Sequence, residues 1–189
     1  MLNKKALSAT AAADKLYVED VFSTYLHTGN GSTQTITNGV DLSGEGGLVW
    51  IKSRSNAQDN QLFDTERGAT KELISNSTAA EATDADTLTA FNTDGFSLGA
   101  DANVNTNAYT YASFTFRKAE KFFDVVTWTG DGTGNRTISH NLGSTPGCII
   151  VKRTDTSTNW FVYHRSVSSA RYGFLYLNTT AAAYTSTDY

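Results

Sequence analysis

The feature that most constrains the fold of this chain is an internal repeat with an offset of about 100 residues. The clearest pair of blocks is Gly47-Leu-Val-Trp-Ile-Lys52 and Gly147-Cys-Ile-Ile-Val-Lys152. Further pairs follow in the same order: Tyr25–Gly31 with Thr127–Gly132, Thr35-Ile36 with Thr137-Ile138, Leu62–Arg67 with Trp160–Arg165, and Leu73–Ala80 with Leu175–Ala182. The shared order argues against chance and predicts two structurally similar units.

The repeat divides the chain into three parts. We predict an N-terminal anchoring arm over residues 1–24, a first unit over 25–120 and a second unit over 121–189. The first copy continues past Ala80 to Arg117, whereas the second ends at Tyr189, so we expect an incomplete second unit. A chain end inside a domain leaves an unpaired sheet edge. Truncation of a longer chain is the favoured explanation, and completion of the second unit by another chain is the alternative.

The arm contains the residues that we expect to contact other proteins. Ala6–Ala13 is too weakly apolar for a secretion signal. Residues 15–22 alternate loosely between apolar and charged side chains, as in a short helix or an edge strand. Segments of this kind are often ordered only when docked. The candidate contacts with a particle or with another subunit are Leu16, Tyr17, Val21 and Phe22.

The predicted fold class is all-β, with tandem β-sandwich or jelly-roll units. The chain is rich in Thr and aromatic residues, which favour strands, and turn signals such as Gly44-Glu-Gly-Gly47 separate short apolar runs. Tyr111–Arg117 alternates: Ala112, Phe114 and Phe116 share one face of the expected strand. Phe123–Trp128 is expected to open the second unit as a strand, and helix is expected only in the arm and over 77–86.

Composition excludes several classes of partner. The formal net charge is -4, the pI is near 5.3 and basic residues are not clustered, so nucleic acid is not expected. No apolar run approaches the roughly 18 residues that a membrane-spanning helix needs, so no membrane insertion is expected. Cys148 is the only cysteine and lies in an apolar run, which predicts a buried, inert thiol.

No set of residues predicts catalysis, a metal or a cofactor. The three histidines lack metal-ligand spacing, and the second copy does not keep the carboxylates Asp64 and Glu66. Arg67 and Arg165 are matched between the copies. An anion or partner contact is one interpretation of them, and a fork that ties a loop to carbonyls is the favoured one. Exposed aromatics could stack on sugars, although core positions are the more common use.

Several motifs resemble one family. They are Gly44–Arg54, Leu62–Ala69, Phe91–Gly99, Ser113–Lys118, Phe123–Gly130, Ser139–Gly143 and Pro146–Arg153. Together they resemble a domain that recurs in structural proteins of tailed bacteriophages, especially marine ones. The resemblance implies lectin-like β-sandwiches, usually longer than this chain and with the second copy complete. It implies no catalytic residues.

These observations lead to an expected function outside enzymology. The resemblance implies a virion structural protein, as a tail-fibre or tail-appendage component that is attached through the arm. Its expected partners are a tail adaptor or capsid subunits and further copies of itself, with a trimer as the expected oligomer. One alternative is a capsid decoration protein. A second is a module that binds host-surface carbohydrate, for which exposed aromatics near Asn and Asp on one concave surface would be required.

Overall fold

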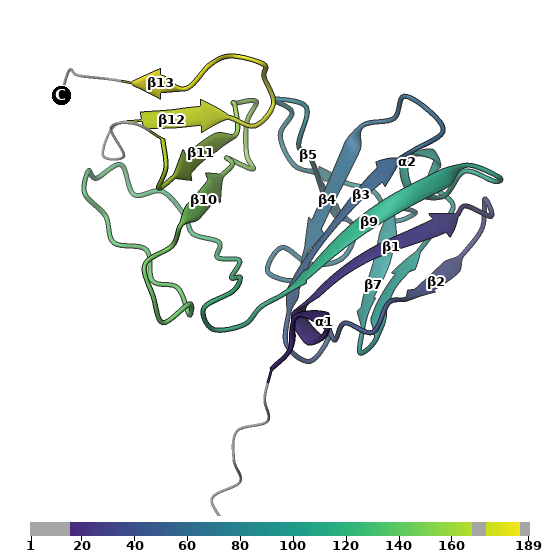
Figure 1. Ribbon diagram of the computed structural model, residues 1–189. Helices are drawn as coiled ribbons and strands as arrows, with labels where there is room; N and C mark the ends of the chain where they lie inside the picture. The colour runs from purple at the N-terminus through teal and green to yellow at the C-terminus, as the bar shows by residue number, and fades with distance from the viewer. Residues whose placement is uncertain (1–15, 168–172, 186–189) are drawn as a thin grey trace, which may run out of the picture.

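The computed structural model describes residues 16–167 and 173–185 and shows an all-β chain (Figure 1). The part of the predicted arm that spans 1–15 lies outside the described residues. The first sheet is antiparallel and has the order β1-β9-β3-β4-β5-β6. Its strands are β1 (Phe22–Thr28), β9 (Thr110–Arg117), β3 (Gly47–Ser53), β4 (Asn60–Asp64), β5 (Lys71–Ile74) and β6 (Ala82–Thr83).

A three-stranded sheet packs on one face of the first sheet and completes a β-sandwich. Its order is β2-β8-β7, with β2 (Gln34–Thr37), β8 (Gly95–Leu98) and β7 (Leu88–Asn92). The core between the sheets is apolar and fully buried, and consists of Ile36, Val40, Leu42, Val49, Ile51, Phe63, Leu88, Phe96, Leu98, Val104 and Tyr111. Burial of such side chains is the main driving force for this packing.

Strand β9 confirms the alternation that its sequence predicted. Tyr111, Ser113 and Thr115 are fully buried and face the core. Phe114 and Phe116 point to the opposite face, where Phe114 is exposed. Strand β3 alternates in the same way, because Val49 and Ile51 enter the core while Leu48 and Trp50 are only half-buried on the opposite face.

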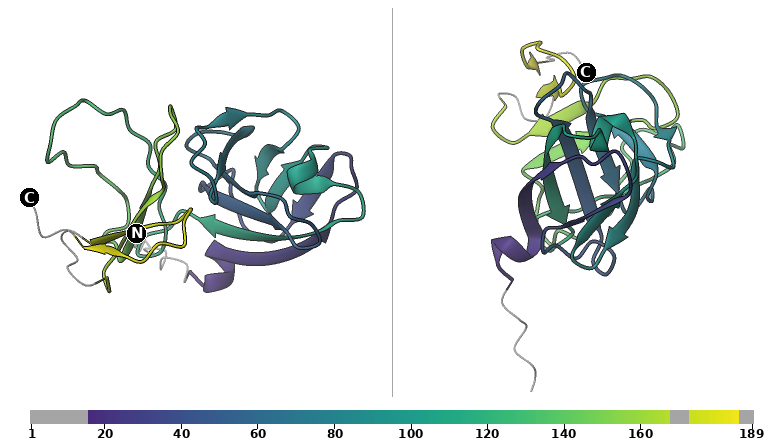
Figure 2. Two further views of the ribbon diagram at one scale, coloured as in Figure 1. Left: turned by 90° about the horizontal axis from the view of Figure 1, so that it is seen from above. Right: turned by 90° about the vertical axis from the view of Figure 1, so that its right-hand side faces the viewer.

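A separate four-stranded sheet lies beside the sandwich (Figure 2). Its order is β10-β11-β12-β13, with β10 (Cys148–Val151), β11 (Phe161–His164), β12 (Gly173–Tyr176) and β13 (Tyr184–Thr185). Because its strands lie in the second predicted unit, we refer to it as the second sheet. Its strand order and antiparallel directions are those of β3-β4-β5-β6.

The hydrogen-bond registers of the two groups of strands coincide as well. Cys148 lies opposite His164 as Leu48 lies opposite Asp64. The loops also correspond: the Trp160 amide donates to the Asn178 side chain at 2.9 Å, and the Asn60 amide donates to the Asn76 side chain at 2.9 Å.

The second sheet contacts the sandwich through a small apolar cluster. Trp160, Leu62 and Leu73 are buried together, and Leu48, Trp50 and Leu177 pack around them. The Trp160 indole Nε1–H donates to the carbonyls of Ile74, at 2.9 Å, and Ser77, at 3.1 Å. The tryptophan therefore buries its ring and also satisfies its one polar atom at the junction.

Four local predictions were wrong. The segment 77–86 forms a turn and β6 instead of a helix, and a helix that the sequence did not indicate, α2 (Ala102–Asn105), begins at the capping side chain of Asp101. The segment 123–128 forms no strand. Its counterpart β1 is held by β9, and the described residues contain no strand beside β10 that could hold it in the same way.

The burial predicted for Cys148 is the fourth wrong prediction. Its thiol is exposed, because β10 is the edge strand of the described sheet and has no neighbouring strand on its outer side. The sequence of β10 is as apolar as that of β3, which predicted burial. Burial, however, depends on a neighbouring strand as well as on composition.

Candidate docking surface

The residues predicted to contact other proteins lie on and around α1 (Val18–Val21). The helix is a single turn, closed where the Asp20 carboxylate accepts a hydrogen bond from the Tyr17 amide at 2.8 Å. Leu16 is 48% exposed and Tyr17 is 55% exposed, so both are accessible. Val21 is 4% exposed and packs inward. Phe22 is half-buried, with its ring 5.0 Å from that of Phe116.

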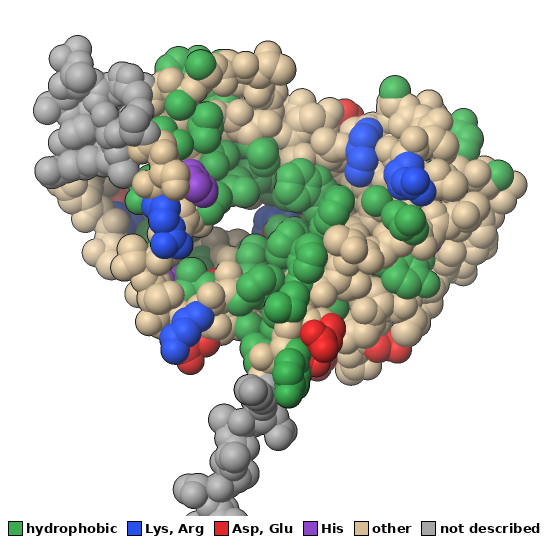
Figure 3. Space-filling model, viewed as in Figure 1, with side chains coloured by type: hydrophobic (Ala, Val, Ile, Leu, Met, Phe, Trp, Pro, Cys, Tyr) green, Lys and Arg blue, Asp and Glu red, His purple; other side chains and the backbone are tan. Residues whose placement is uncertain are grey.

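An apolar surface continues from α1 along the sandwich. It is the face of the first sheet that points away from the core, and we call it the apolar face; it comprises Phe22, Leu26, Leu48, Trp50, Phe114 and Phe116. Leu26 is 62% exposed and Phe114 is 37% exposed. Figure 3 shows hydrophobic side chains in a band along the middle of this view, between the sandwich and the second sheet.

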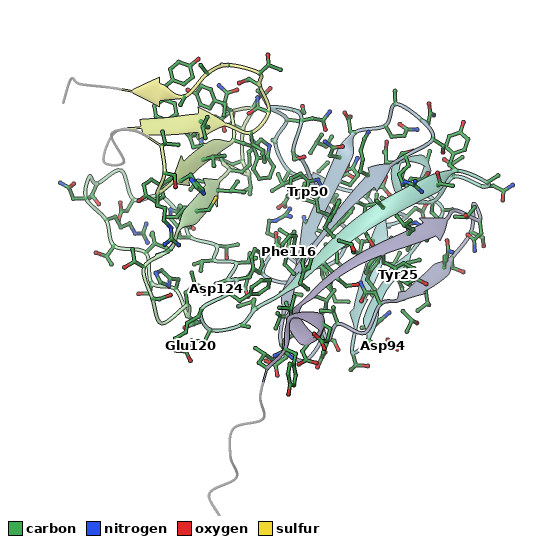
Figure 4. The ribbon with its side chains drawn as sticks, in the orientation of Figure 1. Tyr25, Trp50, Asp94, Phe116, Glu120 and Asp124 are labelled. Carbon is green, nitrogen blue, oxygen red and sulfur yellow. The ribbon has the colours of Figure 1, made fainter. Side chains whose placement is uncertain are left out.

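The connection between the two parts of the chain extends the apolar face. The rings of Phe122 and Phe123 lie 6.5 Å and 5.3 Å from that of Phe116. Trp50, at the other end, packs on the Trp160 cluster. Figure 4 shows Trp50 and Phe116 on this side of the sheet. Apolar side chains therefore run without interruption from α1 to the junction.

A polar hollow lies next to the apolar face, at the start of the connection. It is lined by Glu45, Lys118, Ala119, Glu120, Phe123, Asp124 and Asn141, and Figure 4 labels Glu120 and Asp124 there. The Lys118 ammonium lies 2.6 Å from Glu66 and 3.5 Å from Asp124. The hydrogen bond to Glu66 raises the pKa of Lys118.

The charges of this hollow have structural partners. The Asp124 carboxylate accepts hydrogen bonds from the amides of Val125, at 3.0 Å, and Asn141, at 2.7 Å, in addition to its ion pair with Lys118. These bonds tie residues 124 and 141 to the end of β9. A general acid or base needs a carboxyl that is free to exchange a proton with a substrate, and Asp124 is engaged on both oxygens.

Arg67 ties a loop to the sheet, as the favoured interpretation of this residue expects. Its guanidinium lies 2.6 Å from Asp64 and 3.2 Å from Glu81. It also donates to the carbonyls of Lys71, at 3.1 Å, and Leu62, at 3.3 Å. The Arg67 and Asp64 side chains are each 7% exposed, so this is a nearly dry ion pair with its remaining donors satisfied.

The match of Arg165 to Arg67 does not follow the strand register. The Arg165 amide donates to the Gly147 carbonyl at 2.9 Å, as the Thr65 amide donates to the Gly47 carbonyl at 3.0 Å. Arg165 thus occupies the position of Thr65, and its side chain is exposed. The sequence match aligned Phe63 with Phe161 because both are phenylalanine. This shifted the match by two residues relative to the strand register. The offset changes only after Arg165, in the connection to β12.

One comparison with known proteins identifies a family. A family model described as a domain of unknown function (DUF7483) matches residues 18–189. The chain belongs to the DUF7483 family. The comparisons with curated proteins and with solved structures gave no match. The DUF7483 match includes α1, the sandwich and the second sheet, so the apolar face lies within the family domain.

Whether this surface of the DUF7483 domain contacts a partner stays a prediction, but the exposure of its residues can be compared with the sequence. It singled out Leu16 and Tyr17, which are exposed, but it missed Leu26 and Phe114. The alternation of β9 carries the signal, because it separates Phe114 from the core side. The alternation of a single strand does not show whether another element packs on the face that points away from the core.

Other site types find no support in the described residues of the DUF7483 domain. Within 16–167 and 173–185, no group of three or more His, Cys, Asp or Glu is placed to hold a metal ion. Neither α1 nor α2, the helices of those ranges, is long and apolar enough to cross a membrane.

Proposed function

We propose that this protein is a non-enzymatic structural component of a bacteriophage particle, in a tail fibre or tail appendage. The resemblance of its motifs to phage structural proteins supports the choice of particle. The apolar face supports a role in assembly, because Leu26 and Phe114 are exposed on it and exposed apolar side chains that cluster on a folded domain mark an interaction site. Leu16 and Tyr17 lie at the end of this surface, where the N-terminal segment joins the sandwich.

We also propose that the chain contains two copies of one β-sandwich unit, with residues 25–120 as the first and 121–189 as part of the second. The sequence repeat supports this, and so do the common registers of β3–β6 and β10–β13. The side chains of Asn76 and Asn178 accept corresponding hydrogen bonds, so the loops of the two groups of strands are similar as well. Stacked units of this kind suit a spacer in an elongated appendage.

The expected partners are other virion proteins and further copies of this chain, arranged as a trimer. The paired state of Lys118 and Asp124 in the polar hollow supports a non-enzymatic role. No cofactor or nucleic acid is part of the proposal.

A density map of an intact particle that carries this protein tests the proposal. We expect residues 16–28 to contact a tail adaptor and three copies to surround one axis. Contact of the same residues with capsid subunits would replace the tail assignment with a capsid decoration protein. Binding to a glycan array that is lost on replacing an exposed aromatic such as Tyr25 would favour a carbohydrate-binding module instead.

A further inference from the structure

Strand β1 is an edge of the first sheet, and its outer side pairs with no described strand. The sheet order begins with β1, whose described partner is β9 (Figure 1). Thr24, Tyr25 and Leu26 are all exposed, although successive side chains of a strand point to opposite faces. The strands of the sandwich lie between residues 22 and 117 and its core closes within residues 36–111. The edge is therefore free in a unit whose own core is already closed.

This edge lacks the features that protect the other edges of the sandwich. A free edge invites pairing with another strand unless it is short, bulged, charged or covered. Strand β6 has two residues, and the adjacent Glu81 amide bonds to the Thr154 carbonyl at 2.8 Å. Strand β2 has four residues, and β7 contains a register shift between Leu88 and Ala90. Strand β1 has seven residues in unbroken register with β9, and Phe22–Thr28 contains no charged residue, proline or glycine.

The backbone groups that point outward from β1 can be identified. The Gly29 amide, directly after β1, donates to the Tyr109 carbonyl, directly before β9, at 2.8 Å. Hydrogen-bonded residues alternate along an antiparallel pair of strands. The odd-numbered residues of β1 therefore bond to β9, and the even-numbered residues direct their amides and carbonyls outward.

Two of these outward groups are already bonded within the chain. The Phe22 amide donates to the Val18 carbonyl in the turn of α1, and the Thr28 carbonyl accepts a hydrogen bond from the Gln34 side chain at 3.2 Å. The described residues supply no such partner to the other outward groups, which are the amide and carbonyl of Thr24, the amide and carbonyl of Leu26, the Phe22 carbonyl and the Thr28 amide.

This pattern of free and bonded groups is complementary to itself. If a second copy runs antiparallel with its Tyr25 opposite Tyr25, then Thr24 lies opposite Leu26 of the second copy, and their free groups pair. The free Phe22 carbonyl faces the free Thr28 amide of the second copy, and the bonded Phe22 amide faces the bonded Thr28 carbonyl. A register shifted by two residues would instead set the bonded Thr28 carbonyl against the free Thr24 amide. One register therefore satisfies every free group.

The side chains of β1 fit a second copy as well. Because Phe22–Thr28 is uncharged, two copies meet without repulsion between like charges. Tyr25 is 37% exposed, and the two tyrosines would form an aromatic cross-strand pair. Leu26 is 62% exposed and belongs to the apolar face, so the apolar faces of the two copies would become continuous.

We propose that two copies of this chain associate through β1, antiparallel about a twofold axis at Tyr25, so that their first sheets form one continuous sheet. This contact is isologous, because each copy uses the same strand. The inference goes beyond the proposed function, which names no surface for contact between copies. The pairing uses Phe22–Thr28 and leaves Leu16 and Tyr17 available for attachment. It gives a dimer of the isolated protein, whereas the proposed threefold arrangement belongs to the particle.

A charge exchange at the twofold axis tests the proposal. Sedimentation of the full chain over a range of concentrations should show a monomer–dimer equilibrium. Tyr25→Lys and Tyr25→Glu each place like charges directly opposite one another and should each weaken self-association roughly tenfold or more. An equimolar mixture of the two variants should recover association, because a lysine then faces a glutamate. Thr35→Lys, at an exposed position of the edge strand β2, is the matched control and should dimerise normally.

Hydrogen exchange locates the contact within β1. The amides of Tyr25 and His27 should be protected in monomer and dimer alike, because they bond to β9. The amides of Thr24, Leu26 and Thr28 should exchange fast in the monomer and become protected as the concentration rises. This alternation is expected only if the outward side of β1 forms the contact.

Four results would overturn the proposal. They are a chain that stays monomeric up to its solubility limit, a trimer instead of a dimer in solution, association that Tyr25→Lys does not weaken, and protection of Thr24 and Leu26 in the monomer. The last result would mean that another part of the same chain, such as residues 1–15, covers the edge. The proposed place in a particle is tested separately, because it is read from the particle map.

Discussion

At the residue scale, buried polar side chains of the sandwich determine how its stability responds to pH and to substitution. His27 is buried on the edge strand β1, with its Nε2 3.2 Å from the Val104 carbonyl and its Nδ1 without a partner. An Nε2–H donor to that carbonyl and a bare Nδ1 describe the neutral ring. Burial lowers the pKa of His27 from its ordinary value of 6.5, although the bond to Val104 opposes the shift.

The lowered pKa of His27 makes stability depend on pH in one direction. The unfolded chain takes up this proton more readily than the folded chain, so the stabilisation is present above pH 6.5 and is lost as the pH falls through the folded-state pKa. We expect His27→Gln, whose amide can still donate to Val104, to show a flatter pH dependence. Urea unfolding of both proteins between pH 7.5 and pH 5 measures it, and parallel curves would contradict the assignment of a neutral His27.

Substitutions of Arg67 and Arg165, which the sequence had matched, are expected to differ sharply in their effect on stability. Arg67→Ala leaves the buried Asp64 carboxylate without its partner, and loss of one member of a buried pair costs about 3–5 kcal/mol. Arg165 is exposed, and Arg165→Ala should change the free energy of unfolding by no more than about 0.5 kcal/mol. Chemical denaturation of the two variants provides the comparison. Equal losses would show that the guanidinium of Arg165 has a structural role that its exposure does not suggest.

At the scale of elements, alternation predicted β9 well, and similar composition did not predict similar burial for β3 and β10. The two strands are equally apolar, yet β3 lies between two neighbours and β10 has one. The same reason explains why β1 forms and 123–128 does not. A strand is stabilised by its cross-strand partner, and the partner is set by segments far away in the sequence.

The apolar face provides a prediction at this scale. We expect the double variant Leu26→Ser and Phe114→Ser to remain folded, because both side chains are exposed, and to lose attachment to its partner or self-association. Analytical ultracentrifugation of the isolated protein and incorporation into particles measure the two effects. Tyr184→Ser, which removes another exposed apolar side chain on the second sheet, is the matched control and should retain both. Unchanged association of the double variant would exclude the apolar face as the docking surface.

At the scale of the whole molecule, Trp160 is the most buried side chain of the second part of the chain at its junction with the sandwich. Backbone hydrogen bonds also cross this junction, from the Glu81 amide to the Thr154 carbonyl at 2.8 Å and from the Thr158 amide to the Thr78 carbonyl at 2.9 Å. Trp160 is 4% exposed and reaches two carbonyls of the sandwich with its indole nitrogen. The second sheet has few buried apolar residues of its own. Its folded state therefore depends on contact with the sandwich, whose own core is complete within residues 36–111.

Removal of the Trp160 ring should separate the two parts. We expect Trp160→Ala to cost about 3–5 kcal/mol, the range for large core truncations, and to affect the second sheet selectively. Hydrogen exchange should become fast in β10–β12 while β3 and β9 stay protected. Trp160→Phe keeps most of the ring and should show an intermediate effect. Uniform loss of protection in both parts would mean that the chain unfolds as one cooperative unit.

The sequence by itself determined the all-β class and the position and two faces of β9, because these follow from local periodicity and turn residues. It also indicated Leu16 and Tyr17. The tertiary structure alone decided that Cys148 is exposed, that Arg165 corresponds to Thr65, that 123–128 lacks a strand and that Leu26 and Phe114 are exposed on the apolar face. Each of these depends on which strands are neighbours in a sheet. The sequence periodicity of one strand does not show which distant strand pairs with it.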